Sequence, residues 1–175
     1  EVDAADRAIR RRHRPAPRSR VLQRAVRRAW LCGYDELTGK SFEHRRGWIQ
    51  SKLEDLAKSF GIDCLSFSVM SNHLHVILRN RPDVVETWSD EEVARRWWQL
   101  FPRRREQDGQ AAEPTELELK AYSHPKRVAE CRRRLSDISW WMRALAEPIA
   151  RAANREDAFH GRFWEDRFQC QKFAA

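Results

Sequence analysis

A chain of 175 residues, 41% of them hydrophobic, is long enough to form one domain with its own core. No segment approaches the roughly 18 to 20 consecutive apolar residues of a membrane-spanning helix, so we expect no membrane partner. The 34 lysines and arginines against 26 acids give a net charge of +8, which favours a polyanion as the partner.

The first segment is the most basic part of the chain. Ten arginines and no acid lie between residues 7 and 28, and the planar guanidinium suits bidentate binding of phosphate. We predict a flexible basic arm over residues 1–17 and a single domain over 18–175. The N-terminus lacks the apolar region of a secretory signal and the four cysteines form no close pair, so we expect a reduced, cytoplasmic protein.

Between residues 18 and 80 the sequence alternates between strand-like and helix-like patterns. The apolar residues of 43–60 recur with 4-3-4 spacing, which predicts a helix, and Gly61 stands where a C-terminal cap belongs. Alternating apolar residues then predict a hairpin, with Leu65, Phe67 and Val69 on one face of its first strand. The remaining predicted segments are a strand in the first half of 20–31, a loop over 34–40, hairpin strands over 62–70 and 73–79, and a tight turn at Ser71-Asn72.

The second half of the chain is mainly helical in pattern. Ser89 and Glu92 form a capping box ahead of a helix that Pro102 ends. From Pro125 a 3-4-3-4-3-4 apolar pattern predicts one long helix, which Pro148 should kink or end. A polar loop is predicted over 103–113 and a last strand over Gly161 to Gln171.

The order of these segments is strand, helix, strand, strand, helical region, strand. It predicts an α+β fold of the ferredoxin-like split βαβ type, with a four-stranded antiparallel sheet. The helical region, about 83–157, would be an insertion between strands 3 and 4. In that plan the strand 73–79 lies in the middle of the sheet, and one face of the sheet carries no helices.

The two histidines of that strand, His73 and His75, are candidate metal ligands. Residues i and i+2 of a strand point the same way, about 6.6 Å apart at Cα, so two imidazoles can converge on one ion. Two ligands do not complete a site, and a third must come from elsewhere. The alternative is a pair of half-exposed strand histidines that bond to water or to neighbouring residues.

Six further residues are candidate DNA contacts. Five are arginines that could line a path for the phosphate backbone, and the sixth, Trp164, could act as a stacking platform for a base. Core packing is the alternative for this tryptophan. The five arginines are Arg24, Arg27, Arg28, Arg162 and Arg167.

The stretch MSNHLHVIL, residues 70–78, resembles the HUH motif (histidine, hydrophobic residue, histidine) of single-tyrosine DNA transposases and their REP-associated relatives. VRRAWLCG, EHRRGWIQSKLEDLA and GRFWEDRFQCQ agree with it, so the resemblance covers about 18–80 and 158–172. It implies a ferredoxin-like nuclease that acts on single-stranded or hairpin DNA. His73 and His75 would hold Mg²⁺ or Mn²⁺, and a tyrosine would cleave and rejoin the strand through a 5′-phosphotyrosine.

The chain departs from this family pattern at its C-terminal end. The family tyrosine follows the GRFW-type strand by a few tens of residues, and the sequence stops at Ala175. Its two tyrosines, Tyr34 and Tyr122, do not match the family position. We therefore expect a transposase shortened before its nucleophile. The alternatives are a non-catalytic, domesticated or decayed protein that binds single-stranded or hairpin DNA, and a metal-dependent RNA-binding or nuclease module outside this family. A homodimer is left open.

Overall fold

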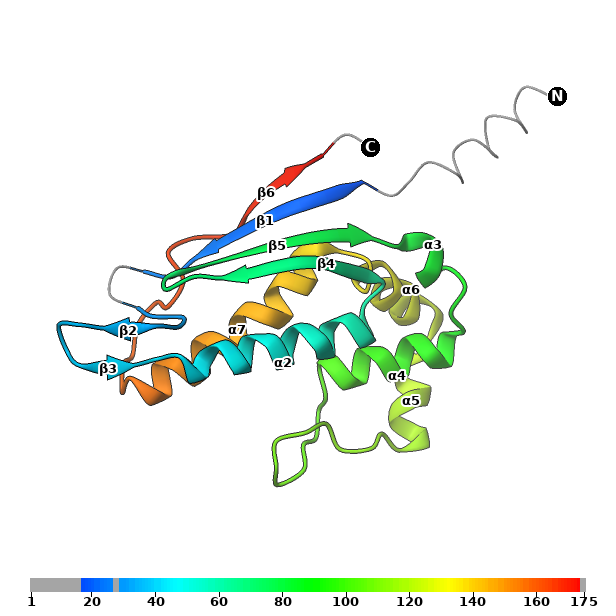
Figure 1. Cartoon of the computed structure of the whole chain (residues 1–175). Helices are drawn as coiled ribbons and strands as arrows, with labels where there is room; N and C mark the ends of the chain where they lie inside the picture. The colour runs from blue at the N-terminus through cyan, green and yellow to red at the C-terminus, as the bar shows by residue number, and fades with distance from the viewer. Residues whose placement is uncertain (1–16, 27–28, 174–175) are drawn as a thin grey trace.

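The computed structural model describes residues 17–26 and 29–173 (Figure 1). Nearly all of the predicted basic arm therefore lies outside the described residues, as do Arg27 and Arg28. The described part is an α+β fold with a four-stranded antiparallel sheet in the order β4-β5-β1-β6. The strands are β1 (Arg18–Arg24), β4 (Ile62–Val69), β5 (His73–Asn80) and β6 (Gln169–Lys172).

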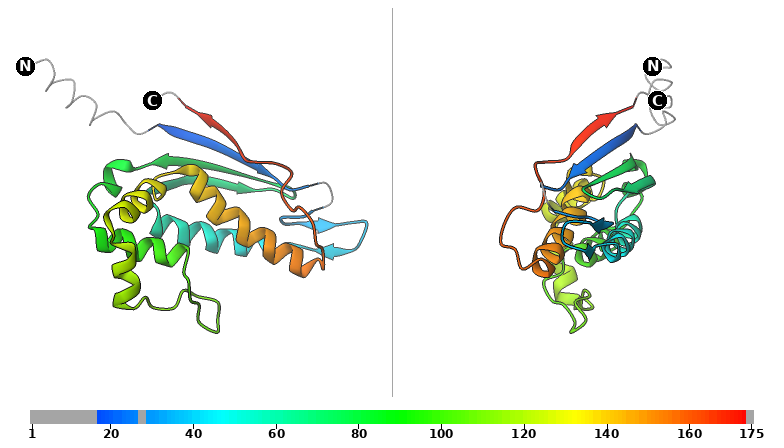
Figure 2. Two further views of the ribbon diagram at one scale, coloured as in Figure 1. Left: turned by 180° about the vertical axis from the view of Figure 1, so that it is seen from behind. Right: turned by 60° about the vertical axis from the view of Figure 1, so that its left-hand side comes forward.

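One face of the sheet is covered by α2 (His44–Ser59) and α7 (Ile138–Glu156), as Figures 1 and 2 show from three sides. Alternate strand residues, among them Val21, Leu74 and Val76, are buried under these helices. The residues between them point to the opposite, open face. The remaining helices lie at one end of the sheet: α3 (Pro82–Val85), α4 (Asp90–Leu100), α5 (Glu116–Tyr122) and α6 (Pro125–Arg134).

The predicted hairpin is confirmed, with one correction to its first strand. β4 and β5 pair in antiparallel register, but the register shifts between Cys64 and Ser66. The bulge takes Leu65 out of the regular alternation. Phe67 follows the bulge and lies opposite Val76, so it shares the predicted face with Val69, which lies opposite Leu74. Because β4 is an edge strand, Leu65 and Phe67 are 44% and 43% exposed, while Val69 is buried.

The helix predicted over 43–60 is also confirmed, but Gly61 has a different role from a C-terminal cap. Phe60 occupies the cap position in an extended conformation, and Gly61 is not among the residues with positive φ. A Cβ at residue 61 would lie 2.0 Å from Val85 Cγ2 and 3.2 Å from the Arg81 carbonyl. Glycine is needed because α3 approaches the backbone here.

The prediction of one long helix from Pro125 is wrong. The chain forms α6, leaves the helix at Leu135, and starts α7 with Asp137 as N-cap, whose carboxylate accepts from Ser139 N–H at 2.7 Å. The Leu135 carbonyl accepts from Gly61 N–H at 2.9 Å, so contacts with a distant segment hold the break. Pro148 does not end α7, which continues to Glu156 and lies under the sheet beside α2.

The last predicted strand is shorter than its sequence pattern. Only residues 169–172 form β6, and Trp164 makes an isolated bridge to Ala25. Residues 159–168 are a loop, because this segment connects the end of α7, below the sheet, with β6 at the edge of the sheet. The loop predicted over 34–40 contains a small hairpin, β2 (Tyr34–Asp35) with β3 (Lys40–Ser41).

None of the helices in the described part of the chain is both long enough and apolar enough to cross a bilayer.

Candidate functional site

The two histidines lie side by side on an inner strand of the sheet. β5 is flanked by β4 and β1, and His73 and His75 alternate with buried Leu74 and Val76, so both face the open side. Their ring centroids are 5.1 Å apart and the rings are nearly perpendicular. Two imidazoles in this arrangement can reach a common ligand.

His73 is oriented by the residue before it. Its Nδ1 lies 2.7 Å from Asn72 Oδ1. An amide oxygen only accepts, so Nδ1 carries the proton and donates it to Asn72. When the ring is neutral, its lone pair is then on Nε2, in the tautomer commonly found when a neighbouring acceptor orients a metal-binding histidine.

His75 is contacted by an arginine of the neighbouring strand. Leu22 is directly opposite His75, and Arg20, on the same face of β1, reaches diagonally so that its Nη2 lies 3.5 Å from His75 Nδ1. Burial lowers the pKa of His75, and the neighbouring His73 and Arg20 lower it further. These effects favour the neutral form of the His75 ring.

The pair by itself fits only part of a metal site. Within residues 17–26 and 29–173, His73 and His75 are not joined by a third histidine, cysteine, aspartate or glutamate in a group that could hold an ion. Mg²⁺ prefers oxygen ligands in an octahedral arrangement. The histidines could supply two positions, and the others would fall to water or to phosphate oxygens.

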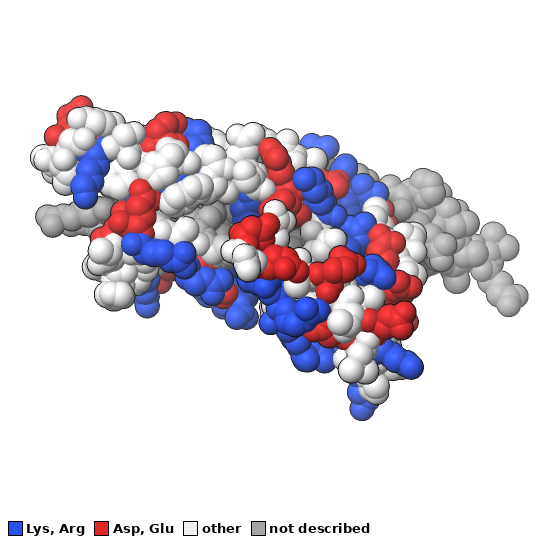
Figure 3. All heavy atoms as spheres, turned by 90° about the horizontal axis from the view of Figure 1, so that it is seen from below, with Lys and Arg blue, Asp and Glu red and all other residues white. Residues whose placement is uncertain are grey.

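The open face around the histidines is basic. β1 presents Arg18, Arg20 and Arg24 on this face, and Arg24 is directly opposite His73. The single acid on the four strands is Asp63, whose carboxylate accepts from Arg79 at 2.6 Å. By contrast, acidic and basic side chains intermingle on the helical side (Figure 3). A polyanion is therefore better matched by the sheet face.

The C-terminal candidates lie in the loop before β6 rather than on a strand. Arg162 is exposed and donates to the Glu165 carbonyl at 3.1 Å. Arg167 is exposed beside a shallow cavity that it shares with Arg24, whose Nε lies 3.9 Å from Glu165 Oε2. The loop acids thus partly offset these arginines.

Trp164 is used mainly for packing. Its ring meets Phe163 edge to face at a centroid distance of 4.9 Å, and its Nε1 donates to the Ala146 carbonyl at 2.9 Å. The side chain is half-buried against the core. This environment favours the packing alternative over a free platform for base stacking.

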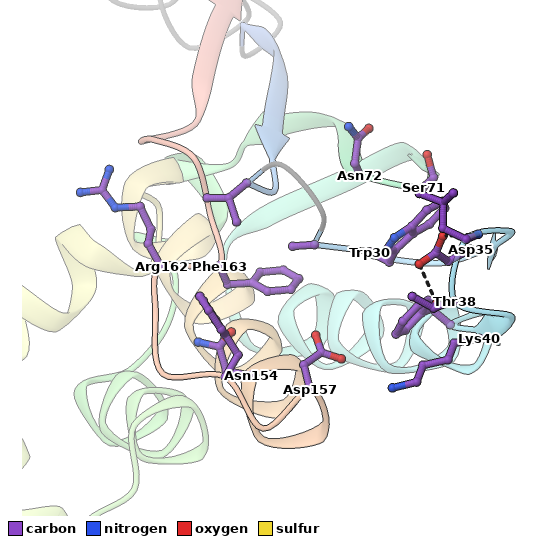
Figure 4. A pocket seen from close by; sticks show the side chains of 15 residues that line it. Trp30, Asp35, Thr38, Lys40, Ser71, Asn72, Asn154, Asp157, Arg162 and Phe163 are labelled. Atoms are coloured by element: carbon purple, nitrogen blue, oxygen red, sulfur yellow. Dashed lines mark hydrogen bonds between the residues drawn. The ribbon is translucent and has the colours of Figure 1, made fainter.

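A pocket of about 860 Å³ opens beside the turn that leads into β5. Figure 4 shows Arg162 and Asn154 on one wall, Trp30 and Lys40 on the other, and Asn72 at the edge. Asn72 is the residue that orients His73, so the pocket and the histidine pair are neighbours. The volume is in the range of small-molecule sites.

A buried arginine, Arg45, contacts several residues that line the pocket. Arg45 is 1% exposed, donates to the Trp30 carbonyl at 2.7 Å, and forms ion pairs with Glu156 and Asp157. Its guanidinium also lies 4.6 Å from the centre of the Phe42 ring. Trp30, Phe42 and Asp157 all line the pocket, so one buried cation holds several of its walls in place.

The two tyrosines have different environments. Tyr122 is buried against Trp98 and under the guanidinium of Arg127, within the helical end of the molecule. It is not available as a nucleophile at the histidine pair. Tyr34 is exposed, on the β2–β3 hairpin.

Sequence analysis did not identify Arg20 and Asn72 as site residues, although their side chains lie within hydrogen-bond distance of the two histidine rings. The signal for Arg20 was the alternation in RSRVLQR, which puts Arg18, Arg20 and Arg24 on one strand face. The diagonal contact itself depends on the register between β1 and β5, which are about 50 residues apart in sequence.

No protein-family model matches the chain, and no curated protein is similar to it at a significant level. What the site can do therefore follows from its own geometry: two histidines that face outward from an inner strand, surrounded by arginines and next to a pocket.

Proposed function

We propose that the chain is a DNA-binding domain of the HUH single-tyrosine transposase type, which receives single-stranded or hairpin DNA on the open face of its sheet. The observation that carries the proposal is the position of His73 and His75, which face outward from an inner strand among the arginines of β1. Phosphate oxygens suit this face because guanidinium groups donate hydrogen bonds and carry charge in fixed directions.

The strand order supports the finer assignment of the fold. With β1, β4, β5 and β6 as the four successive strands of the sheet, α2 follows the first and α7 precedes the last. The spatial order β4-β5-β1-β6 corresponds to 2-3-1-4, which is the ferredoxin-like split βαβ order. The four cysteines are all free, which fits the proposed reducing, cytoplasmic location.

The metal belongs to the same proposal. Mg²⁺ or Mn²⁺ would be held by His73 and His75 and would polarise a phosphate bound beside them. In this proposal Asn72 orients His73, and the arginines of β1 bind the phosphates on either side of the one beside the histidines. The pocket beside Asn72 offers space for a nucleotide next to the bound phosphate.

Fluorescence anisotropy tests the interface. We expect tighter binding to single-stranded and hairpin DNA than to blunt duplex, and we expect Arg24→Gln to weaken it. The matched control is Arg95→Gln, which removes an exposed arginine from α4 on the helical side. Equal losses in the two variants, or a clear preference for blunt duplex, would contradict the proposed interface.

A non-catalytic binding protein on the same scaffold is the second candidate. Two observations favour it: Tyr122 is buried, and the described residues supply no third ligand beside the histidines. A denaturing gel with labelled hairpin DNA, run with Mg²⁺, Mn²⁺ or chelator, separates the candidates. A covalent adduct that disappears in Tyr34→Phe would identify Tyr34 as the nucleophile, and the absence of any adduct with retained binding supports the second candidate.

A further inference from the structure

The pocket beside Asn72 has an aromatic side chain held at its opening. Phe159 lines the pocket and is 55% exposed. It follows the end of α7 in a Schellman motif, in which Phe159 N–H donates to the Asn154 carbonyl at 2.9 Å and Ala158 has a positive φ of 50°. Gly161 leaves room for the ring, because a Cβ at residue 161 would lie 2.2 Å from Phe159 Cε1. The backbone therefore fixes the direction of an aromatic ring that solvent still reaches.

The end of α7 also supplies hydrogen-bond acceptors to this pocket. The Asp157 carboxylate points into the cavity beside Asn154 (Figure 4). One of its oxygens accepts from Arg45 Nη2, and a carboxylate has lone pairs for further donors. Asn154 donates from Nδ2 to the Gly161 carbonyl at 2.8 Å, which leaves Oδ1 as its acceptor. This side of the pocket therefore suits a ligand that presents N–H groups.

Two cations and the end of β1 connect the pocket with the open face of the sheet. Lys40 and Arg162 are exposed and lie on opposite walls of the pocket (Figure 4). Arg24, the last residue of β1, stands two residues before Val26, which lines the pocket. A DNA strand that leaves the open face past Arg24 would therefore bring its phosphates to these cations and a base to the opening of the pocket.

Among the bases of DNA, guanine matches the acceptors best. Its Watson–Crick edge presents two adjacent donors, N1–H and the N2 amino group, and the two oxygens of a carboxylate can accept both. Thymine presents a single donor, N3–H, between two carbonyl oxygens that a carboxylate repels. Stacking on an aromatic ring is available to every base, so Phe159 would supply affinity and Asp157 would supply selection.

We infer that the pocket receives one unpaired guanine of the bound DNA, stacked on Phe159 and hydrogen-bonded to Asp157, with Asn154 Oδ1 as a further acceptor. The inference rests on the proposed function, because it takes single-stranded or hairpin DNA as the ligand. It assigns sequence selection to the pocket. The arginines of the open face contact phosphates, which carry no direct sequence information.

Fluorescence anisotropy with two oligonucleotides tests the selection. One is a thymidine oligonucleotide of about eight nucleotides, and the other is the same strand with a single internal guanine. The repeated thymidines let the strand shift until the guanine reaches the pocket. We expect the guanine to raise affinity about ten-fold. Equal affinities would overturn the inference and leave the proposed function in place.

Asp157→Asn is the decisive variant, because the amide keeps an acceptor for Arg45 and replaces the second oxygen by a donor. We expect the preference for the guanine strand to be lost, a change that a general loss of stability would not produce. Glu156→Gln is the matched control. Glu156 accepts from the same guanidinium at 3.0 Å but does not line the pocket, so this variant should keep the preference. A preference retained in Asp157→Asn, or lost equally in both variants, would overturn the inference.

Phe159→Ala tests the stacking platform. We expect affinity for the guanine strand to fall about ten-fold, and Phe159→Trp to retain it. Phe67→Ala is the matched control, since it removes a phenylalanine that is 43% exposed on the edge strand β4 and lies opposite the buried Val76. Equal losses in Phe159→Ala and Phe67→Ala would contradict the stacking role.

Free nucleotides separate this inference from the proposed function. If neither oligonucleotide binds, the proposed function fails, and the pocket is then tested alone with deoxyguanosine monophosphate. We expect this nucleotide to shift the indole N–H signal of Trp30, a pocket residue, in ¹H–¹⁵N spectra of the wild type, and to shift it less in Asp157→Asn. Deoxythymidine monophosphate should shift it less in the wild type. No shift with deoxyguanosine monophosphate, or equal shifts with both nucleotides, would overturn the selection of guanine.

Discussion

Glycine at position 61 is required by space rather than by backbone conformation. A Cβ there would lie 2.0 Å from Val85 Cγ2, so the buried Val85 side chain, or α3 that carries it, would have to move. We expect Gly61→Ala to lower the free energy of unfolding by about 1–3 kcal/mol, the usual cost of overpacking. Urea denaturation measures this loss.

Gly47 provides the control for this substitution. It lies inside α2, and a Cβ there would meet no atom within 4 Å. Gly47→Ala should therefore stabilise the protein by up to about 1 kcal/mol, because alanine has the higher helix propensity. Val85→Ala combined with Gly61→Ala should recover part of the loss. Similar effects of the two single substitutions would show that α3 does not press on residue 61.

The break between α6 and α7 depends on an N-cap. The Asp137 carboxylate accepts from Ser139 N–H at 2.7 Å. We expect Asp137→Ala to cost about 1 kcal/mol of unfolding free energy, which lowers the melting temperature of a domain of this size by about 2–4 °C. Asp137→Asn keeps the capping group without its charge and should cost much less. Calorimetry measures the melting temperature of both variants. If Asp137→Asn loses as much stability as Asp137→Ala, the charge of Asp137 matters and its capping hydrogen bond does not.

The capping box of α5 makes stability depend on pH. Arg104 donates to Glu118 at 2.8 and 2.9 Å, and the Thr115 N–H donates to the same carboxylate. These partners lower the pKa of Glu118 to about 2, from an ordinary value of 4.5. The folded state therefore holds the ionised form better than the unfolded state does. Its contribution to stability is complete above about pH 4.5 and is lost as the pH falls toward 2.

Glu118→Gln tests this dependence. We expect it to be less stable than the wild type at pH 7 and to lose less stability between pH 4.5 and pH 2, as measured by urea denaturation at each pH. Glu116→Gln removes a charge from the same helical turn and should retain the wild-type dependence. Parallel curves for the wild type and Glu118→Gln would contradict the role of this carboxylate.

At the scale of the whole molecule, the two sides of the sheet differ in charge. The helical side mixes acids and bases, while the four strands of the main sheet carry one acid, Asp63, against the arginines of the open face. If DNA binds to the open face, its counterions are released on binding, so affinity must fall as salt rises. Charge on the helical side should not contribute to this fall.

The salt dependence of DNA affinity can be estimated from the number of arginines that contact phosphates. Three phosphate contacts by Arg18, Arg20 and Arg24 would give a slope of about −2 for log affinity against log salt on single-stranded DNA. We expect each arginine replaced by glutamine to reduce the slope by about 0.7. Anisotropy over about 50 to 200 mM salt measures it. A slope near zero, or one unchanged in the Arg20→Gln/Arg24→Gln variant, would place the DNA elsewhere.

The local pattern of the sequence was sufficient for several elements of the structure. The alternation in 62–79 predicted the hairpin and the common face of His73 and His75, because side-chain direction on a strand repeats every two residues. The apolar spacing of 43–60 predicted α2 because one face of that helix is buried. The order of elements was sufficient to predict a four-stranded antiparallel sheet with β5 inside it.

Other features were decided only by contacts between distant segments. The apolar spacing of 128–149 runs unbroken across the end of α6, and it is the Gly61–Leu135 hydrogen bond that holds the chain where the helix is interrupted. The contact of Arg20 with His75 follows from the register between two strands that local patterns do not specify. The sequence by itself thus determined which residues share a face, since that depends on near neighbours; the tertiary structure decided which faces meet, since that depends on how the whole chain packs.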